Sequence, residues 1–95
     1  MDPAELDLDV DRIGICQACL CLVSTPRDAV KMTPILWDEG LREPALAAVR
    51  KLGDAVALAD LEANGGRSRT ARAIVVHLAR QQEERARLWW QAMQN

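Results

Sequence analysis

Phenylalanine and tyrosine are absent from this 95-residue chain, and threonine is scarce. These residues are enriched in β-strands, so the sequence offers little from which to build a sheet. The only aromatic side chains are Trp37, Trp89 and Trp90, although 49% of the residues are hydrophobic. The core must therefore be aliphatic, and its abundant Leu and Ala favour helix. The composition predicts an all-α fold.

The sequence also lacks a long hydrophobic run and a basic N-terminal region. Its most apolar stretch, residues 13–23, is too short to cross a bilayer, and its first residues are acidic where a secretory signal is basic. Cys16, Cys19 and Cys21 form an odd set within six residues, which fits free thiols in a reducing compartment. We expect a cytoplasmic protein with no membrane partner, folded as one helical domain over residues 1–95.

Helix start signals divide the first half of the chain. Asp2-Pro3-Ala4-Glu5 combines an N-cap, a proline at the first helical position and a carboxylate, and predicts a helix from about Pro3 to Val23 with a buried second half. Thr25-Pro26 repeats the signal. Because proline interrupts a helix, Pro34 is expected to split the next segment into two short pieces, near 26–32 and 34–39, that end at Gly40.

The second half of the chain predicts longer helices. One begins at Glu43-Pro44 and ends at Gly53, and the next is capped by Asp54. The pattern leaves open whether Gly53 breaks or bends one long helix. The first of these two helices has an apolar face of Leu46, Val49 and Leu52, and the second stops at Asn64-Gly65-Gly66.

Ser68 caps the last and longest helix, predicted from Arg69 to about Met93. Counted together, these signals predict a small bundle of about four to six helices with a long C-terminal helix.

The end of this last helix is the most informative feature of the sequence. Residues 80–85 are polar on every face, and apolar residues then return as Leu88, Trp89, Trp90 and Met93. The two indoles lie about 100° apart on a helix, so one narrow seam cannot bury both. Either the helix folds back over its own bundle or its tip docks on another chain. The polar spacer favours docking, and exchange of tips in a homodimer is the simplest closed arrangement.

The net charge of −2 conceals a gradient along the chain. Residues 1–11 carry −5, whereas residues 65–95 carry +4, so the ends are expected to attract each other within one chain or across a dimer. The ten Arg against two Lys suggest a bacterial or phage genome. As an alternative function, the acidic residues mimic phosphate in an inhibitor of a host protein, as in small phage inhibitors. These residues are Asp2, Glu5, Asp7, Asp9 and Asp11.

A second alternative is nucleic-acid binding at the start of the last helix. Arg67, Arg69 and Arg72 flank Ser68, and a helix N-terminus with nearby guanidiniums attracts phosphate. Residues 58–69 and the apolar helix after them resemble the helix, turn and helix of ribbon-helix-helix antitoxins and repressors. The resemblance implies a DNA-binding regulator. That family needs an alternating strand before its first helix, where residues 45–50 read as helix, and the overall acidity also counts against DNA.

No catalytic or metal site emerges from the pattern. Cys16, Cys19, Cys21 and His77 total four possible zinc ligands, but on a helix Cys21 points about 140° away from Cys16. We interpret the cysteines as small buried hydrophobes and His77 as a half-buried structural residue. No nucleophile, base and orienting residue form a set, so we expect no enzyme activity and no cofactor. The leading interpretation is a regulatory or adaptor module that binds another protein chain, most simply itself.

Overall fold

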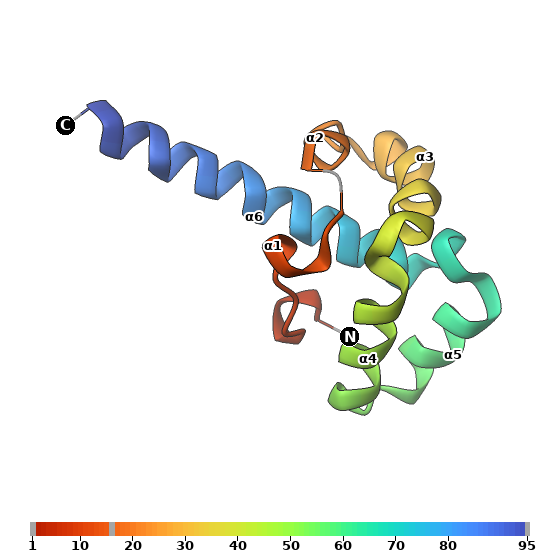
Figure 1. The fold of residues 1–95 in the computed structure, drawn as a ribbon. Coiled ribbons are helices and arrows are strands. Elements are labelled where there is room, and N and C mark those ends of the chain that lie inside the picture. Colours follow the sequence, from red (N-terminus) through yellow and green to blue (C-terminus); the bar gives the residue numbers. More distant parts are fainter. Residues whose placement is uncertain (1, 16, 95) are drawn as a thin grey trace.

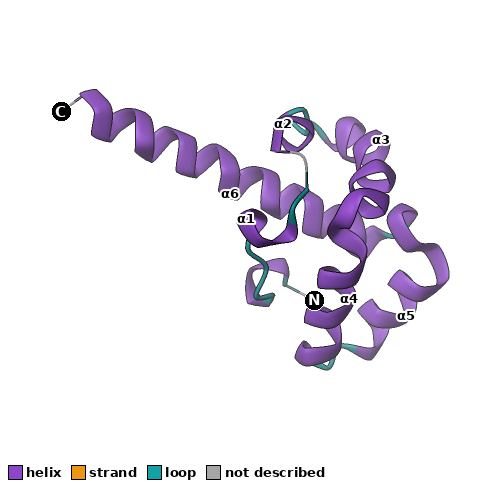
Figure 2. Cartoon of the chain, viewed as in Figure 1, coloured by secondary structure: helices purple, strands orange, loops and turns teal. Residues whose placement is uncertain are grey.

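The computed structural model describes residues 2–15 and 17–94, and every regular element among them is helical (Figures 1 and 2). Four helices have ten residues or more: α3 (Pro26–Leu36), α4 (Arg42–Leu52), α5 (Ala55–Asn64) and α6 (Arg69–Gln94). The shorter elements are the 3₁₀ turns η1 (Pro3–Glu5) and η3 (Gly65–Arg67), the helices α1 (Val10–Ile13) and α2 (Gln17–Cys21), and the π-helical turn η2 (Trp37–Leu41). The all-α class and the long C-terminal helix are confirmed, with four long helices at the lower end of the expected number.

The first half of α6 forms the centre of the fold. Figure 1 shows the other elements gathered around this half, while the second half projects away from them. Among the described residues, the buried hydrophobic side chains are aliphatic apart from Trp37, which is 6% exposed, so the predicted composition of the core is confirmed. Thr33 and Ser68 are buried polar residues. The largest fully buried apolar side chains in this core are Leu20, Leu36, Leu41, Leu61, Ile74 and Leu78.

The continuous helix predicted over residues 3–23 is wrong. Its start is correct, because the Asp2 carboxylate accepts a hydrogen bond from the Ala4 N–H at 3.0 Å, but the 3₁₀ turn ends within three residues. The next residues alternate apolar with Asp, and this alternation puts Leu6 into the core from an extended segment. Gly14, at φ 74°, then ends α1 in the left-handed region.

The helix break predicted at Pro34 is also wrong. α3 runs through Pro34 to Leu36 after a capping box in which Thr25 and Asp28 bond each other's backbone N–H at 3.2 Å. Pro34 supplies no N–H to the carbonyl of Val30, and Val30 is a surface residue, 52% exposed. The break comes instead in η2, where Gly40 has non-helical backbone angles.

Gly53 ends α4, so α4 and α5 are two separate helices and not one bent helix. It adopts the left-handed conformation at φ 81°, and the Asp54 carboxylate accepts the Ala57 N–H at 3.0 Å to begin α5. The predicted apolar face of α4 is only partly correct, because Ala45 and Val49 are buried while Leu52 is 37% exposed. The face of α4 that packs on the core is therefore centred on Ala45 and Val49 and not on the larger leucines. The hydrophobic pattern alone does not indicate this.

A close contact between η3 and the α3–η2 junction sets the position of α6. A Cβ atom added at Gly66 would lie 2.8 Å from the Cα atom of Pro34 and 2.9 Å from the Cβ atom of Trp37. Such distances are too short for any side chain, so only glycine allows the turn to rest on Trp37. The last helix starts shortly after this turn.

Replacing Gly66 by Ala is therefore expected to destabilise the protein. The added methyl group meets backbone rather than a movable side chain, and forcing it in should cost about 1–3 kcal/mol of unfolding free energy. Urea unfolding measures this change. Gly53→Asn is the control, because Asn tolerates the left-handed region and no atom lies within 4 Å of a Cβ there. Equal stability of Gly66→Ala and the wild type would contradict the close contact.

Candidate protein interface on the last helix

The start of α6 is fixed by two side chains from outside the helix. Ser68, only 1% exposed, accepts the Ala71 N–H at 2.9 Å, which confirms the predicted cap. The Asp60 carboxylate of α5 accepts the Thr70 N–H at 3.0 Å and the Thr70 hydroxyl at 2.9 Å. These bonds lower the pKa of Asp60 below its ordinary value, with the bond from the Thr70 N–H contributing most. α6 is therefore held firmly where it leaves the turn.

One stripe of residues runs along the whole of α6, and in the first half of the helix it faces the core. Its members follow one another at intervals of four, three and four residues, and this set of intervals occurs twice. An 11-residue repeat corresponds to about 3.67 residues per turn, close to a straight α-helix, so the stripe stays on one face. The stripe consists of Ala71, Val75, Leu78, Gln82, Ala86, Trp89 and Met93.

Burial changes abruptly along this stripe. Ala71, Val75 and Leu78 are fully buried, whereas Trp89 is 62% and Met93 64% exposed. Figure 1 shows the reason, since the second half of α6 extends beyond the other helices to the C-terminal end of the chain. The face that fills the core in the first half has no covering in the second half among the described residues.

The predicted interface residues lie together on this projecting part, which we call the α6 tip (residues 86–94). Trp90 is 58% exposed and adjoins the stripe, about 60° from Met93 around the helix. Leu88 is also 58% exposed but points about 140° away from Met93, toward the opposite side. The helix therefore does not fold back over its own bundle, and three of the four predicted residues share one face.

Sequence reasoning missed a groove at the base of the tip, between α2 and α6. This α2–α6 groove has a volume of about 570 Å³. Leu20, Cys21 and Val23 line one wall, and the neighbouring residues Ser24, Thr25 and Pro26 extend it. The α6 wall consists of Val76, Ala79, Arg80, Gln82, Glu83 and Ala86. No sequence pattern could reveal it, because its two walls come from segments near opposite ends of the chain.

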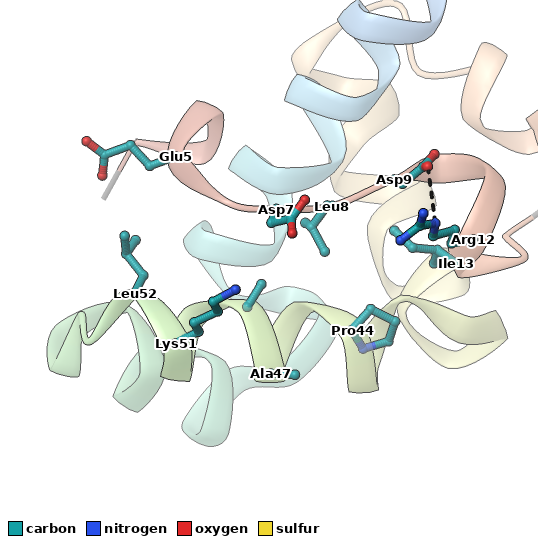
Figure 3. Close-up of a pocket in the computed structure, with 11 residues that line it drawn as sticks. Glu5, Asp7, Leu8, Asp9, Arg12, Ile13, Pro44, Ala47, Lys51 and Leu52 are labelled. Atoms are coloured by element: carbon teal, nitrogen blue, oxygen red, sulfur yellow. Dashed lines mark ion pairs between the residues drawn. The ribbon is translucent and has the colours of Figure 1, made fainter.

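A second groove of about 600 Å³ lies between the N-terminal segment and α4. In Figure 3 the carboxylates of Glu5, Asp7 and Asp9 come from the N-terminal segment, opposite Pro44 and Lys51 of α4. Arg12 pairs with Asp9 at 3.7 Å, at a site so exposed that the pair adds little stability. Of the predicted acidic residues, Asp2, Glu5, Asp7 and Asp9 are exposed, and the side chain of Asp11 lies outside the described residues.

The acidic and basic ends of the chain meet within one molecule. η1 packs against α6, and Asp2 lines the same hollow, about 460 Å³, as Arg72, His77 and Arg80. The predicted attraction between the acidic and basic ends can therefore act within a single chain, between Asp2 and the arginines of α6.

The predicted nucleic-acid contacts gather near the start of α6, but the surroundings suit phosphate poorly. Arg67 and Arg69 are exposed, whereas Arg72 is half-buried and donates a hydrogen bond to the Arg67 carbonyl at 2.8 Å. The first N–H groups of the helix already bond Asp60 and Ser68, so a phosphate would meet a carboxylate there. Residues 45–50, where the ribbon-helix-helix family has its strand, are helical within α4.

The cysteines do not all behave as small buried hydrophobes. Cys16 lies outside the described residues, Cys19 packs half-buried against the core, and Cys21 is exposed at the α2–α6 groove. The interpretation of Cys21 as buried is wrong, because short α2 turns Leu20 inward and its neighbour outward. His77 is half-buried, as expected. Among the described residues, no three His, Cys, Asp or Glu side chains gather closely enough to hold a metal ion.

Comparison with family models, with curated proteins and with solved structures finds no match to this chain. None of the described helices combines the length and the apolar character needed to cross a bilayer.

Asp60→Asn is expected to destabilise the protein by about 1 kcal/mol at pH 7, because it removes the charge from the bonds that hold Thr70. Since folding lowers the pKa of Asp60, its contribution is complete above the ordinary value of 3.8 and is lost as pH falls through the folded value. The difference from the wild type should therefore shrink in acid, as urea unfolding at several pH values would measure. Asp38→Asn, at an exposed site in η2, is the charge-matched control. A difference in unfolding free energy that stays constant throughout the acid range would contradict a stabilising role of the charged Asp60.

Proposed function

We propose that this protein is a non-enzymatic helical interaction module that assembles with a second copy of itself through the α6 tip and serves a regulatory or adaptor role. The proposal is supported above all by the exposure of Trp89, Trp90 and Met93 on the continuation of the buried stripe. Tryptophan is enriched where interfaces are anchored, because it buries a large area with few rotatable bonds. A rigid helix that carries two of them into solvent is suited to docking on a protein surface.

Self-assembly is favoured because the tip repeats the character of a face that this protein already buries. Ala71, Val75 and Leu78 show that the stripe packs against helices of this fold. A two-fold dimer would cover both tips at once and leave no tip open to further addition, since the same patch serves on each protomer.

The other candidate functions have less support. Nucleic-acid binding at Arg67, Arg69 and Arg72 would have to accommodate the Asp60 carboxylate beside the helix start. Phosphate mimicry would use the exposed carboxylates of the N-terminal segment, part of which already faces α6. Neither function gives a role to the exposed indoles.

The double variant Trp89→Ala with Trp90→Ala is expected to abolish dimer formation, while the helical circular dichroism signal stays nearly unchanged. The indoles lie outside the core, so their removal should weaken the interface and leave the stability of the fold unchanged. Sedimentation or light scattering over a range of concentrations measures the assembly. Val56→Ala, which removes an 82% exposed apolar side chain from α5, is the control and should assemble like the wild type. Unfolding of the double variant, or a wild-type protein that stays monomeric, would show that this proposal is wrong.

A further inference from the structure

We infer that the α2–α6 groove is the receptor for the α6 tip of a second copy, in a dimer whose two α6 helices pack antiparallel with the two-fold axis beside Ala86. This inference rests on the proposed self-assembly and adds the docking site, the direction of the helices and their register.

The stripe on α6 determines the register. Ala86 is small and exposed and lies between Gln82 and Trp89 at the base of the tip, so two helices can approach closely there. With the axis at this residue, Met93 of one copy lies level with Ala79 of the other, and Trp90 lies level with Gln82. Both Ala79 and Gln82 line the groove. The same pairing occurs at the other end of the dimer by symmetry.

The groove suits a large apolar side chain. Its volume of about 570 Å³ is within the range of pockets that enclose compact ligands, and Leu20, Val23 and Val76 contribute apolar walls. Ala79 and Ala86 leave room along the α6 side. An indole from a partner copy therefore meets Leu20 and Val23 on the α2 side. On the α6 side it meets Val76 and the two alanines, with polar side chains beside them.

The charges on the groove side of Ala86 favour the antiparallel direction. Glu83 lines the α2–α6 groove and Arg87 lies about 40° further round the helix, so both lie on the groove side of Ala86. In an antiparallel pair these equal sides of the two helices face each other. Glu83 of one copy then lies only about 3 Å along the axis from Arg87 of the other. Each dimer contains this opposite-charge pair twice.

The buried area agrees with a stable dimer. Covering the two exposed indoles and Met93 removes roughly 400 Å² of each tip from water. The groove loses roughly half as much, and symmetry doubles the sum to roughly 1,200 Å², the lower end of the range for specific interfaces.

Two single charge reversals test the register. Glu83→Arg and Arg87→Glu should each raise the dissociation constant of the dimer about tenfold, because each variant alone places like charges opposite one another. An equimolar mixture of the two variants should dimerise like the wild type, since the mixed dimer restores both opposite-charge pairs. If a substitution weakened the dimer by disturbing its own helix, the mixture would be weakened as well. Recovery of dimer formation in the mixture therefore shows that the two residues meet between chains. Sedimentation and Trp fluorescence on the same samples provide the measurement.

A matched pair of substitutions tests the groove. Ala86→Arg places a long charged side chain in the α2–α6 groove and should abolish the dimer, whereas Ala47→Arg does the same in the groove beside α4 and should leave it intact. Both positions are exposed on helices, so both variants are expected to fold. A dimer that needs Trp89 and Trp90 but ignores Ala86→Arg and shows no recovery in the mixture would overturn this inference alone. A wild-type monomer at every concentration would overturn the proposed self-assembly and this inference with it.

Discussion

The contact of Gly66 with Pro34 and Trp37 is the constraint on which the rest of the structure depends. It presses the turn before α6 against the only buried aromatic side chain and so determines where the last helix begins. Ser68 and Asp60 then hold the first turn of α6, and the helix fills the centre of the fold. With 26 residues, about 39 Å in length, α6 exceeds the molecule's shorter dimensions of 26 and 20 Å, so it lies along the long dimension of 47 Å, and its second half extends beyond the other helices (Figure 1).

This geometry divides α6 into two physical environments without changing its pattern. The stripe is aliphatic and buried at Ala71, Val75 and Leu78 and becomes aromatic and exposed at Trp89 and Met93. Exposure of large apolar side chains to water is unfavourable, and burying them against another surface lowers the free energy. The groove at the base of the tip offers such a surface on each copy, which connects the shape of one chain to the proposed pairing of two.

Local signals were predicted well where the interaction itself is local. The caps at Thr25, Asp54 and Ser68 each join a side chain to a backbone N–H three residues away, so a short stretch of sequence contains the whole interaction. The prediction failed over residues 3–23 because the burial of Leu6 depends on segments far along the chain. The predicted break at Pro34 was wrong because the helix continues through the proline. The carbonyl that loses its N–H partner belongs to Val30, which is a surface residue.

The sequence by itself determined the helical class, the starts and stops of the later helices and the presence of an apolar tip beyond a polar spacer, because propensity, capping and periodicity act over a few residues. Only the tertiary structure decided that the tip projects and that a groove opens between α2 and α6. These features depend on how distant segments pack: Gly66 on Pro34, Asp60 on Thr70, and Leu20 in the common core. Such contacts leave no periodic trace in the chain, so they had to be seen in the folded molecule.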